Sequence, residues 1–136
     1  MRDILRVDDS AISDADGLLR RILPQPEWMK MEQGVVRPSS MAFLDRRNEV
    51  SVFLSRLKTI EVLLASHPSD GAAEVEARVP RAHEQLVASA PDEGEDGHDP
   101  AHALICPKVP LGTKKQKAAA RAMAMAAVIR KLPKPL

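Results

Sequence analysis

The segment from residue 113 to residue 131 constrains the fold more than any other part of the chain. Its sequence, TKKQKAAARAMAMAAVIRK, is rich in Ala, Lys and Met, which favour the α-helix. Gly112 precedes the segment as a helix breaker, and Thr113 is a typical N-cap residue. We therefore predict a terminal helix over 113–131, which at ~1.5 Å per residue would be nearly as long as a small domain is wide.

Shorter elements are predicted in the first half of the chain. Apolar residues recur at helical spacing over 18–23, so we expect a short helix there that ends at Pro24. The stretch 35–57 has β-branched and aromatic residues on both sides of a polar centre and predicts a β-hairpin. Apolar and polar residues alternate from Val50 to Leu54, the period of two expected of a half-buried strand.

Farther along the chain the pattern is mixed. Residues 59–66 predict a short helix with Thr59 as its N-cap, whereas 75–79 and 103–106 predict strands. Residues 80–90 contain an apolar patch that fits either type of element.

Together these elements predict an α+β fold, with a small, mostly antiparallel sheet and the long C-terminal helix packed on one face. The 136 residues are the length of one ordinary domain, so we expect a single domain over 1–136. The acidic segment 91–100, PDEGEDGHDP, has the composition of a solvated loop.

Charge is distributed unevenly along the chain. Residues 1–106 carry 12 Lys or Arg and 19 Asp or Glu, a net charge of −7, whereas residues 107–136 carry 8 Lys or Arg and no acid, a net charge of +8. Such an asymmetry indicates an anionic partner, unless the acidic part of the same fold neutralises the basic part.

The predicted terminal helix concentrates these cations on one side. At 100° per residue its side chains form a stripe that is basic at first and apolar later, comprising Lys114, Lys117, Arg121, Met125 and Val128. Two alternatives explain such a stripe: the helix enters the core after Arg121, or the stripe binds another protein with an acidic and apolar surface. The second alternative predicts a non-enzymatic accessory protein, a subunit of a multi-protein system.

Nucleic-acid binding through the same cations is the competing hypothesis. The cations suit phosphate groups, but the chain has only one Trp, two Phe and no Tyr on which bases could stack. The sequence leaves the oligomeric state open.

The chain lacks the signals of a secreted or membrane protein. Its single cysteine, Cys106, excludes an intramolecular disulfide, and its first residues lack the apolar run of a signal peptide. No apolar run is long enough to cross a bilayer, so we expect a cytoplasmic protein without membrane association. We expect no cofactor and no metal, because Pro100 interrupts the spacing of His98, His102 and Cys106 that would align three ligands on a helix.

Two strings, RPSSMAFLDRRNEVSVFL at 37–54 and DPAHALICPK at 99–108, resemble segments of a group of small bacterial proteins. In that group an R-P-S-S-x-x-F segment precedes a serine-valine strand, and a P-A-H-A segment precedes a strand and a lysine-rich end. The resemblance implies a bacterial setting and no mechanism. It indicates which residues to test first: Arg37, Pro38, Ser39, Ser40, Phe43, Ser51, His102 and Lys108.

These strings also supply a third hypothesis, a small enzyme. Arg37, Ser39, Ser40 and His102 form a candidate polar site, in which His102 would act with Arg37, Ser39 or Cys106. The hypothesis requires these side chains to converge on one pocket.

Overall fold

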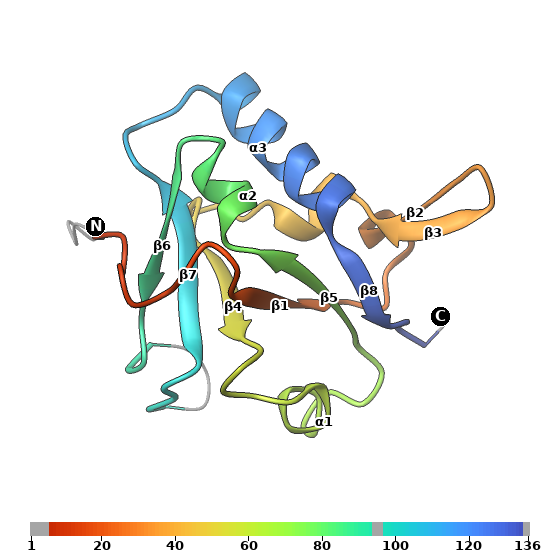
Figure 1. Cartoon of the computed structure of the whole chain (residues 1–136). Helices are drawn as coiled ribbons and strands as arrows, with labels where there is room; N and C mark the ends of the chain where they lie inside the picture. Colours follow the sequence, from red (N-terminus) through yellow and green to blue (C-terminus); the bar gives the residue numbers. More distant parts are fainter. Residues whose placement is uncertain (1–5, 94–96, 135–136) are drawn as a thin grey trace.

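A computed structural model of the chain describes residues 6–93 and 97–134. Six strands form one antiparallel sheet (Figure 1). In spatial order they are β6 (Gln85–Ser89), β7 (His102–Pro107), β4 (Val50–Leu54), β1 (Gly17–Ile22), β5 (Gly71–Glu76) and β8 (Val128–Lys131). A separate hairpin pairs β2 (Met29–Glu32) with β3 (Val35–Pro38).

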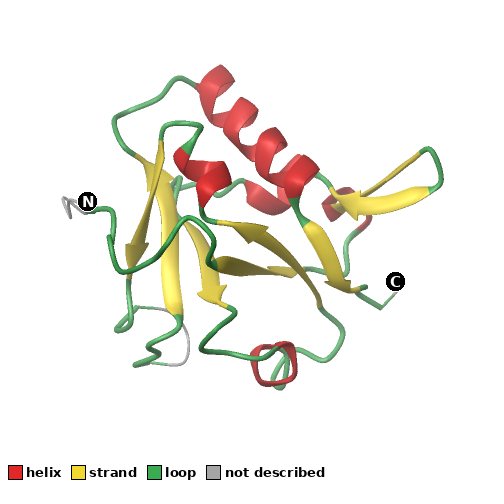
Figure 2. Cartoon of the chain, in the orientation of Figure 1, coloured by secondary structure: helices red, strands yellow, loops and turns green. Residues whose placement is uncertain are grey.

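Helices lie on both sides of this sheet (Figure 2). They are the 3-10 helices η1 (Pro26–Trp28) and η2 (Ser40–Phe43) and the α-helices α1 (Ile60–Leu63), α2 (Arg78–Arg81) and α3 (Thr113–Ala126). The long helix α3 covers one face, where it contacts η2 and α2, and the short α1 lies at the other face. The predicted α+β fold with a C-terminal helix on one face of the sheet is confirmed.

Alternation along β4 separates the two faces of the sheet. Val50, Val52 and Leu54 are buried in one cluster with Met123 and Ala124 of α3. The intervening residues of β4 point to the opposite face, which we call the α1 face. The inner side of α3 is built mostly from alanine, whose small side chain lets the helix approach the elements beneath it closely.

The predicted helix at 18–23 is wrong, because these residues form β1. This strand lies inside the sheet between β4 and β5, with Leu18 in the cluster under α3 and Leu19 in the cluster under α1. Since both faces are covered, the consecutive residues Leu18 and Leu19 are both apolar, and the period of two that marks a half-buried strand is lost.

The predicted pairing within 35–57 is also wrong, although both of its strands exist. The strand β3 pairs with β2 across a turn in which Gln33 and Gly34 have φ values of 52° and 78°, as in the tight turns of β-hairpins. The strand β4 pairs with β1 and β7 instead. Between β3 and β4 the chain forms η2, whose Ala42 and Phe43 are fully buried and hold the two strands apart in different sheets.

The terminal helix is shorter than predicted. It ends at Ala126, and the rest of the predicted range forms the edge strand β8, which pairs with β5. The β-branched Val128 and Ile129 favour this extended pairing. Gly112, not Thr113, is the N-cap residue, and no side chain caps the helix.

Other predicted elements are confirmed. Thr59 caps α1 and accepts a hydrogen bond from the Val62 N–H at 3.2 Å. The predicted strand at 103–106 corresponds to β7, and the patch in 80–90 contains β6. The predicted strand at 75–79 is wrong beyond Glu76, because β5 ends there and Arg78 and Val79 begin the helix α2. Of the predicted loop 91–100, residues 94–96 lie outside the described residues, and the others form neither helix nor strand.

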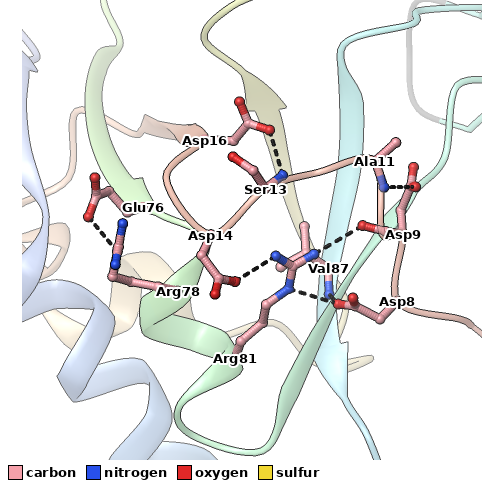
Figure 3. A network of polar contacts seen from close by, with 10 residues as sticks. All are labelled: Asp8, Asp9, Ala11, Ser13, Asp14, Asp16, Glu76, Arg78, Arg81 and Val87. Carbon is pink, nitrogen blue, oxygen red and sulfur yellow. Dashed lines mark hydrogen bonds and ion pairs between the residues drawn. The ribbon is translucent and has the colours of Figure 1, made fainter.

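The segment before β1 is tied to α2 and β6 by Arg81 (Figure 3). Its guanidinium donates to the carboxylates of Asp8 at 3.0 Å and Asp14 at 2.8 Å, and to the Asp9 carbonyl at 3.0 Å. The Val87 N–H donates to Asp8 Oδ1, and the Val87 carbonyl accepts from the Asp9 N–H, both at 2.9 Å. The segment therefore covers part of the edge of β6, which would otherwise expose unpaired backbone groups.

Gly71 sets how closely β8 approaches β5. A Cβ atom at this position would lie 2.4 Å from the Lys131 carbonyl oxygen and 2.6 Å from the Pro133 nitrogen. We expect Gly71→Ala to lower the free energy of unfolding in urea by about 1–3 kcal/mol, because backbone atoms must move. Gly112→Ser is the control, since its Cβ meets nothing within 4 Å. Equal stability of Gly71→Ala and the wild type would contradict the close approach.

Candidate functional site

The outer side of α3 carries the predicted partner-binding residues. Lys114, Lys117, Arg121 and Met125 are exposed on the helix, and Val128 is exposed at the start of β8. We call these five residues the α3 surface. Since the side chain of Met125 is 64% exposed and that of Val128 is 50% exposed, the alternative in which the helix enters the core after Arg121 is wrong.

The core contacts of α3 come from its other side, on Gln116, Ala119, Ala120, Met123 and Ala124. Of the two methionines in the last turns, only Met123 is buried.

The cations of the α3 surface are not neutralised within the described part of the chain. The neighbouring Lys115 approaches Glu84 at 3.9 Å, whereas Lys114, Lys117 and Arg121 form no ion pair with any described residue. No acidic residue lies in the first turn, where the helix dipole is positive. This end of α3 therefore presents cations and free backbone N–H groups together.

The structure does not bring Arg37, Ser39 and Ser40 to His102. Arg37 lies in the β2–β3 hairpin, with its Nε 3.5 Å from a carboxylate oxygen of Glu32. Ser39 donates a hydrogen bond to the Glu27 carbonyl, and Ser40 begins η2. None of the three lines the cavities that His102 borders.

His102 lies on the α1 face and is only 3% exposed. It pairs across strands with Phe53 of β4, and the two ring centroids are 5.2 Å apart. Its Nδ1 is 2.7 Å from the Ala90 carbonyl oxygen, and its Nε2 is 2.6 Å from Ser51 Oγ. Because a carbonyl oxygen only accepts hydrogen bonds, these partners assign the proton to Nδ1 and leave Nε2 of the neutral ring to accept from Ser51.

Two adjoining cavities of about 550 and 540 Å³ open beside this pair. Residues that border both are Asp45, Arg47, Ser51, Glu93 and His102. Their volumes are in the range of small-ligand sites, which is about 300–1,000 Å³.

Several acidic residues that line these cavities form ion pairs with neighbouring cations. The Arg6 guanidinium donates to Glu49 at 2.9 Å and to Glu93 at 2.8 Å. On the other side Lys58 is paired with Asp99, and its ammonium lies 4.6 Å from the Phe53 ring centroid. Burial of Asp99 opposes its charge, but the hydrogen bonds from Lys58 and from the Ala101 N–H, together with nearby positive charge, lower the pKa of Asp99.

Arg20 supports the strand that carries Ser51. Its guanidinium donates to the Ser51 carbonyl at 2.9 Å and to the Ala42 carbonyl at 2.7 Å, and it lies 5.3 Å from the ring centroid of Trp28. Burial lowers the pKa of Arg20 to about 10, which leaves it charged at neutral pH. This arginine therefore joins β1 to both β4 and η2.

Cys106 is a buried residue of β7. Burial raises the pKa of its thiol to about 11, and it packs with Leu86 and Ala88. Cys106 does not line the cavities that His102 borders. Among the residues that the structure describes, no three His, Cys, Asp or Glu side chains are grouped so that they could hold a metal ion.

Sequence reasoning selected His102 and Ser51 separately but did not join them. The alternation of β4 indicates that Ser51 is on the face away from Val50 and Val52, which is the only local signal of its position. The roles of Ala90 and Arg20 depend on contacts between segments far apart in the sequence.

The chain matches no family model, no curated protein and no solved structure. Within residues 6–93 and 97–134, no helix has both the length and the apolar character needed to cross a membrane. Function is therefore inferred from the residues and their geometry.

Replacing Arg20 by lysine tests its role as a double donor. A lysine keeps the charge but cannot span both carbonyl groups as the planar guanidinium does. We expect Arg20→Lys to lower the free energy of unfolding by about 1–3 kcal/mol, the cost of a buried acceptor left unsatisfied. The control Arg46→Lys changes an exposed arginine and should stay within ~0.5 kcal/mol of wild type. Equal effects of the two variants in urea unfolding would contradict this role.

The thiol of Cys106 should be inert in the folded protein. With a pKa of about 11, roughly one thiol in a thousand is ionised at pH 8, and only the thiolate reacts. We expect Ellman's reagent to modify Cys106 at least ~100-fold more slowly in native protein than in protein unfolded in guanidinium. Similar rates in the two states would show that the thiol is accessible.

Proposed function

We propose that this chain is a bacterial cytoplasmic accessory protein that binds another protein through the α3 surface. The partner is an acidic surface with an apolar patch beside it. The observation that carries the proposal is the exposure of a stripe that is basic in its first half and apolar in its second.

Charge complementarity supports an acidic partner. Lys114, Lys117 and Arg121 form no ion pair with any described residue, although residues 1–106 carry a net charge of −7. Lysines in the first turn are unfavourable beside the positive end of the helix dipole, typically by a few tenths of a kcal/mol each. A carboxylate of the partner would remove this cost and bind the free N–H groups at the same end.

The apolar half of the stripe supports a protein partner in particular. Met125 is 64% exposed, Val128 is 50% exposed and Leu132, beyond β8, is 57% exposed. Methionine is flexible and polarisable, and it is enriched in the buried centres of interfaces. Phosphate recognition alone would not need these apolar side chains.

Nucleic-acid binding by the same cations is less well supported. Of the three aromatic residues, Phe43 is fully buried, and Trp28 and Phe53 are packed against core clusters. None of them belongs to α3 or β8, the elements that carry the α3 surface, so neither element offers its own platform for bases.

A binding assay with defined probes separates the two hypotheses. The probes are a fluorescent peptide of alternating Glu and Leu, the same peptide with Ser in place of Leu, and a DNA duplex, each measured by fluorescence anisotropy at physiological salt. We expect the Glu-Leu peptide to bind best, because it supplies both carboxylates and apolar side chains.

Variants assign the binding to the α3 surface. The triple change Lys114→Glu, Lys117→Glu and Arg121→Glu should weaken peptide binding at least about tenfold, or ~1.4 kcal/mol. Met125→Ser should remove the preference for Leu over Ser in the peptide. The matched control, Lys30→Glu with Arg56→Glu and Lys108→Glu, changes the net charge equally at exposed positions elsewhere and should bind as wild type.

Two results would reject the proposal. One is equal peptide affinity of wild type and the α3 triple variant. The other is preferred binding of DNA, lost in the same variant and falling steeply with salt, which would establish the nucleic-acid hypothesis instead.

A further inference from the structure

The α1 face carries an arrangement that the proposed binding function does not use. Ser51 Oγ lies 2.6 Å from His102 Nε2, and His102 Nδ1 lies 2.7 Å from the Ala90 carbonyl oxygen. The order hydroxyl, imidazole, acceptor is that of an activated serine: the imidazole takes the hydroxyl proton, and the acceptor fixes the tautomer and orientation of the ring.

The backbone holds both members of the pair in place. Ser51 pairs with Leu104 across β4 and β7, and its carbonyl accepts from Arg20 at 2.9 Å. The His102 carbonyl accepts from the Ala90 N–H at 3.0 Å, so Ala90 contacts His102 through both its N–H and its carbonyl. A nucleophile and a base on rigid strands keep their geometry better than a pair on loops.

The solvent exposure of His102 and Ser51 differs in the way that a buried base and an accessible nucleophile require. His102 is 3% exposed, whereas Ser51 is half-buried and borders both cavities. The base is thus shielded from water while the hydroxyl is open to a ligand.

The cavity walls indicate the charge of that ligand. Three acids line the larger cavity: Glu49 and Glu93 are already bound by Arg6, and Asp45 Oδ2 accepts a hydrogen bond from the Arg47 backbone N–H at 2.8 Å. Arg46 and Arg47 line the larger cavity as exposed guanidinium groups, and Arg47 borders both. Guanidinium groups bind carboxylates and stabilise negative charge that develops on an attacked carbonyl oxygen.

We propose that Ser51 is a catalytic nucleophile activated by His102, and that the cavity beside it takes a small ester bearing a carboxylate. Ser51 Oγ attacks the ester carbonyl carbon while its proton passes to His102 Nε2. The tetrahedral intermediate expels the alcohol oxygen, which takes that proton, and acyl-Ser51 remains. Water then attacks the acyl carbon, gives its proton to Nε2 and releases the carboxylic acid, and Ser51 Oγ recovers the proton.

Labelling with an alkyl fluorophosphonate tests the nucleophile. Ser51 Oγ bonds to phosphorus, fluoride leaves, and the hydroxyl proton passes through His102 to solvent. We expect one adduct by intact mass, mapped to Ser51 by peptide sequencing and absent in Ser51→Ala. Ser55→Ala is the matched control, because Ser55 follows on the same face just after β4 and should be dispensable. No adduct in the folded wild type would overturn the proposal.

Two further variants test the base. In His102→Gln we expect Ser51 to be labelled about 100-fold more slowly, which is the lower end of the rate enhancement that a general base contributes. Since this change is in a buried position, Ser51→Cys gives a second test. At pH 6 its introduced thiol should react with iodoacetamide at least about tenfold faster than the thiol introduced by Ser55→Cys, because only the former has an imidazole to take its proton. Equal rates in either comparison would mean that His102 has only a structural role.

The substrate class has its own test. The p-nitrophenyl monoester of succinic acid, which carries a carboxylate, should be hydrolysed about tenfold faster than neutral p-nitrophenyl acetate, and Arg46→Gln with Arg47→Gln should remove the difference. Equal hydrolysis of both esters by the wild type would exclude an anionic substrate.

The α3 triple variant should keep full labelling of Ser51, so that failure of the binding function and failure of this site are distinguishable.

Discussion

Between β1 and β4 the ladder has two residue pairs, Leu18 with Leu54 and Leu19 with Phe53, and one further hydrogen bond runs from the Ser55 N–H to the Gly17 carbonyl. Where this ladder stops, the guanidinium of Arg20 donates to the Ser51 carbonyl, a group that a strand N–H would otherwise satisfy. A charge at this depth is unfavourable, as its lowered pKa of about 10 reflects, but two hydrogen bonds and the Trp28 ring offset the cost. The strand that presents Ser51 therefore depends on this contact.

The alternation of β4 gives the protein two chemically different sides. Val50, Val52 and Leu54 bury the alanine-rich side of α3, and in doing so they turn its lysines outward. The residues between them place Ser51 against His102 on the α1 face. The proposed binding surface and the proposed Ser51–His102 pair thus lie on opposite sides of one sheet.

Much of the fold was predictable because the local signals were strong. The Thr59 cap, the alternation of β4 and the alanine-rich helix each depend on neighbouring residues alone, and each is present in the structure. Predictions failed where tertiary contacts override local pattern. The local pattern of β1 predicts a helix because both faces of this strand are buried, and the pattern around β3 and β4 predicts that they pair because nothing in the sequence shows that η2 inserts between them.

The sequence by itself determined the α+β class, the basic and apolar stripe and the absence of acids beside it, since these follow from composition and periodicity along one segment. Only the tertiary structure decided that this stripe stays in solvent and that the helix gives way to β8. It also decided that His102 meets Ser51 and not Arg37 or Ser39. The physical reason is that strand order and pairing result from long-range burial, which positions residues 51 apart in the chain within a hydrogen bond of each other.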